Sequence, residues 1–278
     1  LKLWKPENYG KKFYGPSTLR TGVEKSRNLM TVRIAQNIGI KKIAEFANEL
    51  NIYKNPEELL SLSLGSSETT LLRLTSAYCS FVNGGKLINP KFIDRIQDSE
   101  GNTIFNSENR ECEGCDQISY LSNEVPKIKN NFKQIISKET AYQMTSILEG
   151  TVKRGTAKGL RDLNLDLAGK TGTTNKNTDT WFVGFSSNYV IGVYVGYDEP
   201  SSLGKYETGS RTAMPIFKDF VKSAIKKDSA RPFKIPKGIK MLVVNSKTGE
   251  RASYNDESII IEAFKEKNLI NNKIQYGN

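Results

Sequence analysis

The sequence predicts an α+β fold, an antiparallel sheet flanked by helices, and three observations support this prediction. Apolar residues recur at helical spacing in several segments between residues 29 and 82. Short strand-like runs then follow one another at 167–174, 180–186 and 189–197, separated by the polar turns NKNTD and SSN. An amphipathic segment comes after them. Because helices precede the strands rather than alternate with them, an antiparallel meander is favoured over a parallel sheet.

Each expected helix shows an apolar face repeating at about i, i+3, i+4 and i+7. The third ends at Gly84 and Gly85, which are typical helix terminators. In chain order the faces are Leu29-Val32-Ala35-Ile38, Ile40-Ile43-Ala44-Ala47-Leu50, Leu71-Leu74-Tyr78-Phe81-Val82, Ala141-Met144-Leu148-Val152 and Phe217-Phe220-Val221-Ala224-Ile225.

The remaining segments are expected to form smaller units. Residues 87–118 read as short strands and turns, with a turn at 100–102. A proline-rich link, RPFKIPKG, leads into MLVVNSKTGERAS, which predicts a strand–turn–strand unit. We therefore expect a main domain at 1–233 and a small C-terminal appendage at 234–278.

Composition narrows the functional classes. The chain has 278 residues with 41 basic and 30 acidic side chains, so its net charge is +11. This charge suits an anionic ligand or a negative surface, or is simply a solvated basic surface, and no dense basic run interleaved with aromatics indicates nucleic-acid binding. We see neither an apolar run long enough for a membrane helix nor a signal peptide, and a first residue of leucine suggests an internal fragment.

The absence of histidine is the most informative count. It excludes a Ser-His-Asp or Cys-His catalytic group within these residues and makes a zinc or haem site improbable. We expect no metal and no cofactor. Any proton transfer near neutral pH must then use a carboxylate, a tyrosine, a cysteine or a lysine with a shifted pKa.

The run LAGKTGTT, at 167–174, is an unusual strand because it contains a lysine, a glycine and several hydroxyls. Strand alternation places Thr171 and Thr173 on one face and Lys170, Gly172 and Thr174 on the other. Two hydroxyls can donate to a carboxylate, glycine admits a close neighbour, and lysine attracts an anion. These features suit an anionic, peptide-like ligand along a sheet edge, but on this short motif alone a plain polar edge strand is the favoured interpretation.

The surrounding sequence resembles the transpeptidase domain of class A, bifunctional penicillin-binding proteins. The similar elements run from about Trp4 to Phe217 and lie in the order found in that family. They are WKPENYG and EKSRN near the start, then GTA at 155–157, KTGTT at 170–174, DTWFVG at 179–184, YDEP at 197–200 and AMPIF at 213–217.

The resemblance implies serine acyl transfer that cross-links peptidoglycan stem peptides and is blocked by β-lactams. Ser26 and Lys170 would carry protons, and Asn28 would hold the substrate amide. Thr171 and Thr173 would hold the terminal carboxylate, and the Thr173 N–H would form half of an oxyanion hole. Gly172 and Thr174 would also bind the substrate along this strand. Strict alternation places Lys170 on the face opposite the threonines, so its side chain would have to reach round toward Ser26.

The family's first motif, Ser-x-x-Lys, carries the nucleophile and should precede Ser26. The only matches, 202–205 and 223–226, follow the KTG strand and are interpreted as chance, as is a second KTG at 247–249 in the C-terminal turn. We therefore expect the nucleophile, a glycosyltransferase domain and a membrane anchor upstream of Leu1. A scaffold or sensor without a nucleophile, and a β-lactamase, remain as alternatives.

The resemblance also implies a location and partners. The catalytic domain would lie on the periplasmic side of the inner membrane, acting on stem peptides and the lipid-linked precursor and meeting other cell-wall synthesis proteins. Cys112 and Cys115 form a C-x-x-C whose oxidised and reduced states are both open from sequence. With Cys79 as the only other cysteine, zinc binding is disfavoured.

Overall fold

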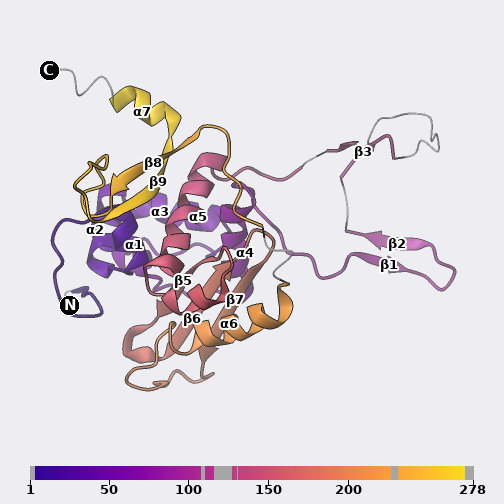
Figure 1. Ribbon diagram of the computed structural model, residues 1–278. Coiled ribbons are helices and arrows are strands. Elements are labelled where there is room, and N and C mark those ends of the chain that lie inside the picture. The colour runs from indigo at the N-terminus through magenta and orange to yellow at the C-terminus, as the bar shows by residue number, and fades with distance from the viewer. Residues whose placement is uncertain (1–3, 108–109, 116–126, 130, 227–230, 273–278) are drawn as a thin grey trace.

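A computed structural model describes residues 4–107, 110–115, 127–129, 131–226 and 231–272. At its centre is a three-stranded antiparallel sheet in the order β5-β6-β7, as the meander predicted. Helices α4 and α5 cover one face of this sheet and α6 covers the other (Figure 1). The α+β prediction is confirmed.

The element bounds follow the expected order closely. The helices are α1 (Leu19–Glu24), α2 (Asn28–Ile38), α3 (Ile40–Glu49), α4 (Leu71–Val82), α5 (Lys138–Lys153), α6 (Ala213–Ala224) and α7 (Glu266–Asn272), with short 3-10 turns η1 (Leu60–Leu64), η2 (Lys158–Leu163) and η3 (Asn175–Asn177). The strands are β1 (Arg95–Gln97), β2 (Thr103–Asn106), β3 (Cys112–Glu113), β4 (Lys127–Ile128), β5 (Ala168–Thr173), β6 (Asp179–Phe185), β7 (Val190–Gly196), β8 (Ile239–Asn245) and β9 (Ile259–Lys265).

Side chains on the two faces of β6 pack into two separate hydrophobic cores, because successive side chains point to opposite sides of the strand. Phe182 is fully buried against Phe217 of α6, with ring centroids 4.8 Å apart. Phe185 is buried on the other face, beside Leu148 of α5 and the ring of Tyr78 in α4. The sheet is therefore fixed from both sides, which gives β5 a rigid support.

The main helices begin and end where local chemistry favours it. Thr70 caps α4 and Ser137 caps α5, each accepting a hydrogen bond from a backbone N–H in the first turn. After α4 the chain turns through Gly84 and Gly85 at φ of 80° and 92°. At Gly85 a Cβ would lie 2.0 Å from the Ile136 carbonyl oxygen, so this stop requires glycine.

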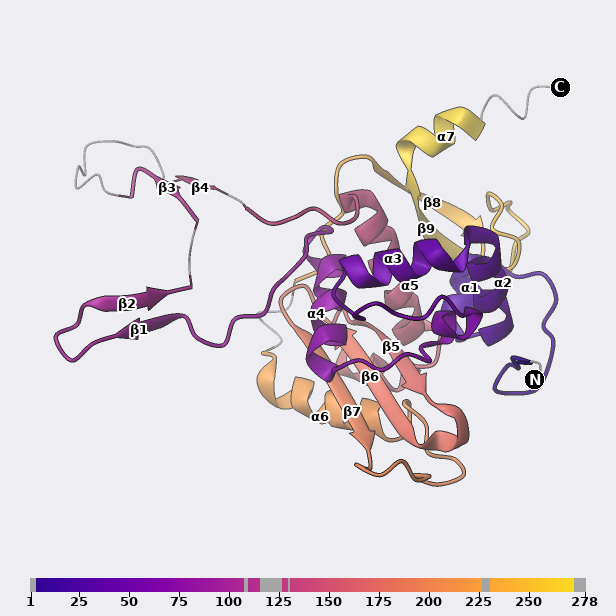
Figure 2. The same cartoon turned by 180° about the vertical axis from the view of Figure 1, so that it is seen from behind.

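Strands β1 to β4 form an arm that stands away from the body (Figure 2). They make two separate two-stranded antiparallel pairs, β1 with β2 and β3 with β4. The expected turn at 100–102 is present, with Gly101 at a φ of 87°. The part of the expected 87–118 region at 108–109 and 116–118 lies outside the described residues.

Cys112 and Cys115 form a disulfide across the β3 turn, which resolves the alternative that the sequence left open. Cys79 is a free, partly buried thiol on α4, and burial raises its pKa. Within the described ranges, none of the helices has both the length and the apolar run needed to cross a bilayer.

The prediction for the C-terminal strand pair was wrong in its second strand. Strand β8 pairs along its whole length with β9, at 259–265, whereas residues 251–253 contribute only the single bridge Val244–Arg251. The tight turn at 246–250 exists, but the run Ile259-Ile260-Ile261 is the better strand former because β-branched side chains favour a pleated ladder. Helices α1 and α7 were not expected, since each is too short to show a period.

Candidate active site

The Ser-Arg-Asn segment forms the turn between α1 and α2. Ser26 adopts a left-handed φ of 51°, and its N–H donates to the Val23 carbonyl at 3.1 Å. Asn28 is the first residue of α2. A non-glycine residue with positive φ is uncommon and is frequently found where a side chain must be aimed. Here the conformation presents the Ser26 hydroxyl toward β5.

Lys170, in the middle of β5, reaches this hydroxyl. Its Nζ donates to Ser26 Oγ at 2.8 Å and to the Thr171 carbonyl at 2.8 Å. Burial lowers the pKa of Lys170 to about 8. The contact joins residues 144 positions apart and brings two of the predicted site residues together. A lysine with this pKa can give or accept a proton near neutral pH without histidine.

A buried ion cluster holds the turn against the sheet. Glu24, on α1, is 4% exposed and accepts from Arg154 Nη2 at 2.6 Å and from Arg20 Nη1 at 3.4 Å. The Glu24 carbonyl also accepts from the Thr156 N–H at 3.1 Å. Gly150 and Gly155 make this approach possible, because a Cβ at either would overlap Glu24. Two residues before Ser26, the chain is therefore fixed to the end of α5.

The threonines of β5 lie on the face opposite Lys170, as alternation predicted. Thr171 Oγ1 lies 2.9 Å from Thr156 Oγ1, and Thr173 Oγ1 accepts from the Gly209 N–H at 3.0 Å. In a hydroxyl pair only one O–H is used, and an accepting hydroxyl keeps its proton. Both threonines therefore still have a donor available nearby for a carboxylate.

Gly172 lies beneath the loop that carries Gly209. A Cβ at Gly209 would stand 2.5 Å from the Gly172 carbonyl oxygen and 2.5 Å from that of Trp181. Backbones can approach this closely only at glycine. Since β5 is an edge strand of its sheet, this loop and the strand edge together bound the face that bears the threonines.

The other two predicted residues are engaged elsewhere. Asn28 Nδ2 donates to the Glu7 carbonyl at 2.9 Å, which leaves its second N–H proton for another partner. Thr174 lies just beyond β5, where its hydroxyl accepts from the Asp179 N–H at 2.8 Å and pairs with Thr178. The Thr174 side chain thus closes the turn between β5 and β6.

The two out-of-order Ser-x-x-Lys matches lie away from this arrangement. Ser202 accepts from the Gly204 N–H at 3.2 Å in an irregular loop, and Ser223 donates to the Asp219 carbonyl at 2.6 Å on α6. Neither hydroxyl contacts a lysine Nζ among the described residues. In the same ranges no cluster of His, Cys, Asp or Glu side chains could hold a metal ion.

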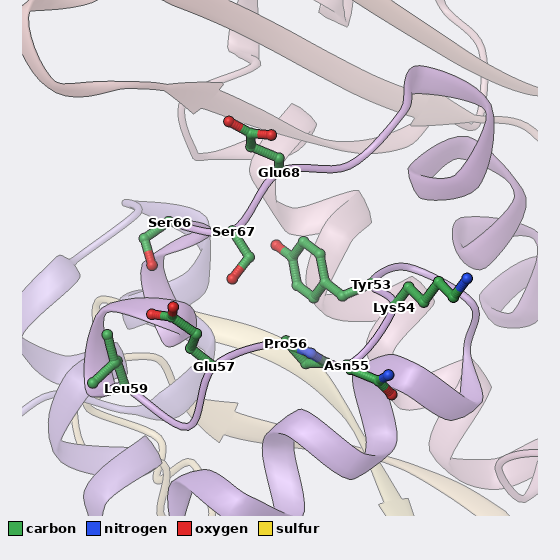
Figure 3. Close-up of a pocket in the computed structure, with 9 residues that line it drawn as sticks. All are labelled: Tyr53, Lys54, Asn55, Pro56, Glu57, Leu59, Ser66, Ser67 and Glu68. Carbon is green, nitrogen blue, oxygen red and sulfur yellow. The ribbon is translucent and has the colours of Figure 1, made fainter.

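A pocket of about 360 Å³ is lined by residues 53–57, 59 and 66–68, which lie between α3 and α4 in the chain (Figure 3). Tyr53 points its hydroxyl toward Ser67 across this pocket, and burial raises the Tyr53 pKa. None of its lining residues belongs to the Ser26–Lys170 arrangement.

Residues 2–222 match the family described as the penicillin binding protein transpeptidase domain. The chain belongs to the penicillin-binding protein transpeptidase family. It is 43% identical over 272 residues to penicillin-binding protein 1A of Rickettsia bellii and 32% identical over 302 residues to that of Pseudomonas aeruginosa. Those alignments include 97% and 95% of this chain but only 34% and 36% of the relatives, so the chain spans about a third of their length.

Solved penicillin-binding proteins have the same fold. A crystal structure of penicillin-binding protein 1A from Haemophilus influenzae superimposes with a TM-score of 0.80 at 30% identity, over 95% of this chain and 42% of that one. The PonA1 protein of Mycobacterium tuberculosis gives 0.65 at 21% identity, over 83% and 62%. The fold inferred from the KTGTT and WFVG elements is therefore that of this family.

Three residues that support the predicted site residues were not themselves predicted: Glu24, Thr156 and Gly209. Glu24 and Thr156 lie within segments that carried the resemblance, but the sequence does not indicate that the Thr156 N–H donates to the Glu24 carbonyl. Gly209 lies just before the AMPIF element and was not predicted as a site residue. Only the folded chain shows that Thr156 and Gly209 contact the hydroxyls of β5.

Proposed function

We propose that this chain is the transpeptidase part of a penicillin-binding protein that cross-links peptidoglycan stem peptides by serine acyl transfer. The observation that carries the proposal is the 2.8 Å contact between Lys170 Nζ and Ser26 Oγ, within a chain that belongs to this family. The contact would supply a proton path within a chain whose 278 residues include no histidine.

The reaction has two steps. A serine Oγ attacks the carbonyl between the two terminal D-alanines, the C–N bond breaks, and the departing D-alanine takes a proton. An amine of a second stem peptide then attacks the ester, which restores the serine and forms the cross-link. We assign proton relay to Ser26 and Lys170 and amide binding to Asn28.

Thr171 and Thr173 bind the terminal carboxylate in this proposal, and the Thr173 N–H contributes to the oxyanion hole. Gly172 allows the substrate and the Gly209 loop to approach the strand. We expect Thr174 to shape the end of the strand through its turn contacts rather than to touch the substrate.

The nucleophile belongs, we propose, to a Ser-x-x-Lys segment that precedes residue 1 in the complete protein. The transpeptidase domain occupies 1–233, with 234–278 as an appendage. A glycosyltransferase domain, a membrane anchor and an extracytoplasmic location complete the proposal. The Cys112–Cys115 disulfide supports an oxidising compartment. A solved relative bound to penicillin V supports β-lactams as ligands.

Fluorescent penicillin tests the proposal. The complete protein should acquire a stable adduct on a serine of a Ser-x-x-Lys motif, and residues 1–278 alone should acquire none, because the proposed nucleophile is not among them and Ser26 is assigned to proton relay. Peptide mapping by mass spectrometry locates the adduct.

The same measurement separates the alternatives. Rapid turnover of penicillin would identify a β-lactamase, and a complete protein that is never acylated would favour a scaffold or sensor. A penicilloyl peptide from within residues 1–278 would show that our assignment of the nucleophile is wrong. Ser202→Ala and Ser223→Ala should leave labelling of the complete protein intact.

A further inference from the structure

A cavity of about 850 Å³ opens where the end of α4, the start of α5 and the turn between β6 and β7 meet the segment 231–237. It shares no residue with the Ser26 turn or with β5. Its volume lies within the usual range for ligand pockets and exceeds what a single small anion fills.

One wall of this cavity is aromatic. Phe81, Tyr142 and Phe233 line it, and each is partly buried. The ring of Phe233 packs 5.7 Å from that of Phe185, which anchors the 231–237 segment to the core. Burial raises the pKa of Tyr142, so this wall is neutral at physiological pH. An occupant would therefore place apolar groups here.

The rim is strongly basic. Lys138, Arg231, Lys234 and Lys237 are exposed around the cavity, and none makes an ion pair or a side-chain hydrogen bond with any described residue. Among the described residues that line the cavity, only Glu139 carries a carboxylate, and its pKa is lowered by hydrogen bonds from its own N–H and from Ser137 and by nearby lysines. Unpaired cations around a hollow create a potential that attracts anions.

The backbone of residues 231–237 is also unpaired. In the described part of the chain, none of its N–H or C=O groups makes a hydrogen bond. Pro232 and Pro236 lack an N–H, but the other residues offer donors and acceptors along a run that is neither helix nor strand. Backbone groups without a partner can hydrogen-bond to the backbone of a bound peptide.

We propose that this cavity binds an extended acidic peptide of a partner protein, with apolar side chains between its carboxylates. The carboxylates pair with the rim cations, the apolar side chains contact the aromatic wall, and the peptide backbone pairs with 231–237. The volume, the wall and the free backbone favour a peptide over an inorganic anion.

Fluorescence polarisation with the complete protein tests this proposal. The probe is a fluorescein-labelled peptide of sequence Asp-Phe-Glu-Asp-Leu-Glu. Its binding should weaken as salt rises, because ions screen exposed charges. The triple variant Lys138→Gln, Lys234→Gln, Lys237→Gln should raise Kd by roughly 10- to 100-fold, since each exposed pair is worth a factor of about two to five.

A matched triple variant controls for net charge. Lys41→Gln, Lys42→Gln and Lys158→Gln remove the same charge from exposed positions outside the cavity and should change Kd less than about twofold. A probe with serine in place of phenylalanine and leucine should bind several-fold more weakly, because it loses the apolar contact. Unchanged penicillin labelling and unfolding temperature would show that both triple variants remain folded.

Several results would overturn the proposal. One is an equal rise in the Kd of the probe in the two triple variants. Another is no binding of the acidic probe by the unaltered protein. A third is displacement of the probe by millimolar inorganic phosphate. Binding of phosphatidylglycerol vesicles through the same three lysines would assign the cavity to a membrane surface instead. A shift in Kd confined to the cavity triple variant, with phosphate and vesicles inert, supports the peptide site.

Discussion

Lys170 is held in a partly buried position where its charge is costly. Its pKa falls from 10.5 to about 8, so between these two pH values the unfolded chain binds more protons than the folded one. Stability therefore rises with pH across this window. Below pH 8 the cost of the buried charge is fully present, up to about 3 kcal/mol.

Lys170→Met should therefore stabilise the protein at pH 7, by roughly 1–3 kcal/mol after the lost hydrogen bonds are counted. The gain should shrink between pH 8 and 10.5 and be absent above it. Urea unfolding at a series of pH values measures this. Lys41→Met, at an exposed position of α3, is the control. It should change the free energy of unfolding only slightly, and by the same amount at every pH. A pH-independent gain for the Lys170 variant would contradict the role of burial.

Thr171 and Thr173 can be tested by removing their hydroxyls with little change in shape. Thr171→Val and Thr173→Val should each slow acylation of the complete protein by a carboxylate-bearing β-lactam by about ten- to a hundredfold, the range for a charged hydrogen bond. An esterified β-lactam should be affected much less. Equal losses on both ligands would mean that the hydroxyls only hold Thr156 and the Gly209 loop in place.

At the scale of elements, α1 depends on charges that it shares with the end of α5. Glu24→Gln leaves the buried Arg20 and the half-exposed Arg154 facing a neutral group. Unbalancing a buried ion cluster is strongly destabilising, so we expect a loss of about 2–4 kcal/mol in the free energy of unfolding. Penicillin labelling should also slow, because the Ser26 turn follows Glu24 directly.

Glu149→Gln is the matched control for this variant. Glu149 pairs with Lys153 at 2.7 Å on the same helix α5, but that pair is solvent-exposed on its lysine side. Its loss should cost less than about 1 kcal/mol. Similar destabilisation by the two variants would show that the Glu24 cluster has no special role in holding α1.

Local elements could be predicted from the sequence because their signals are local. The apolar periods of α2 to α6 and the meander β5–β7 lie within short windows. The β8 partner was assigned wrongly because strand pairing is non-local, and a nearby turn competed with a better strand further along. The Lys170–Ser26 contact could be anticipated only through the family resemblance, since 144 positions separate the residues.

For the whole molecule, the C-terminal sheet β8–β9 is tied to the body through few polar contacts. Arg20 of α1 pairs with Glu262 of β9, and Gln143 of α5 donates to the Ala263 carbonyl at 2.9 Å. Glu262→Gln should speed hydrogen exchange in 239–245 and 259–265 by roughly tenfold while β5–β7 stay protected. Glu250→Gln, exposed on the same unit, should change neither region. If hydrogen exchange became faster by the same factor throughout the chain, the Arg20–Glu262 pair would not be a contact that holds β8–β9 separately.

The projecting arm of β1 to β4 determines how the molecule tumbles and scatters. A compact chain of 278 residues has a radius of gyration of roughly 19 Å. Because the arm stands clear of the body, it adds long interatomic distances to the scattering signal (Figure 2). It also increases hydrodynamic drag more than its mass alone would. X-ray scattering in solution should therefore give a skewed distance distribution with a long tail. Sedimentation should be slower than for a sphere of the same mass.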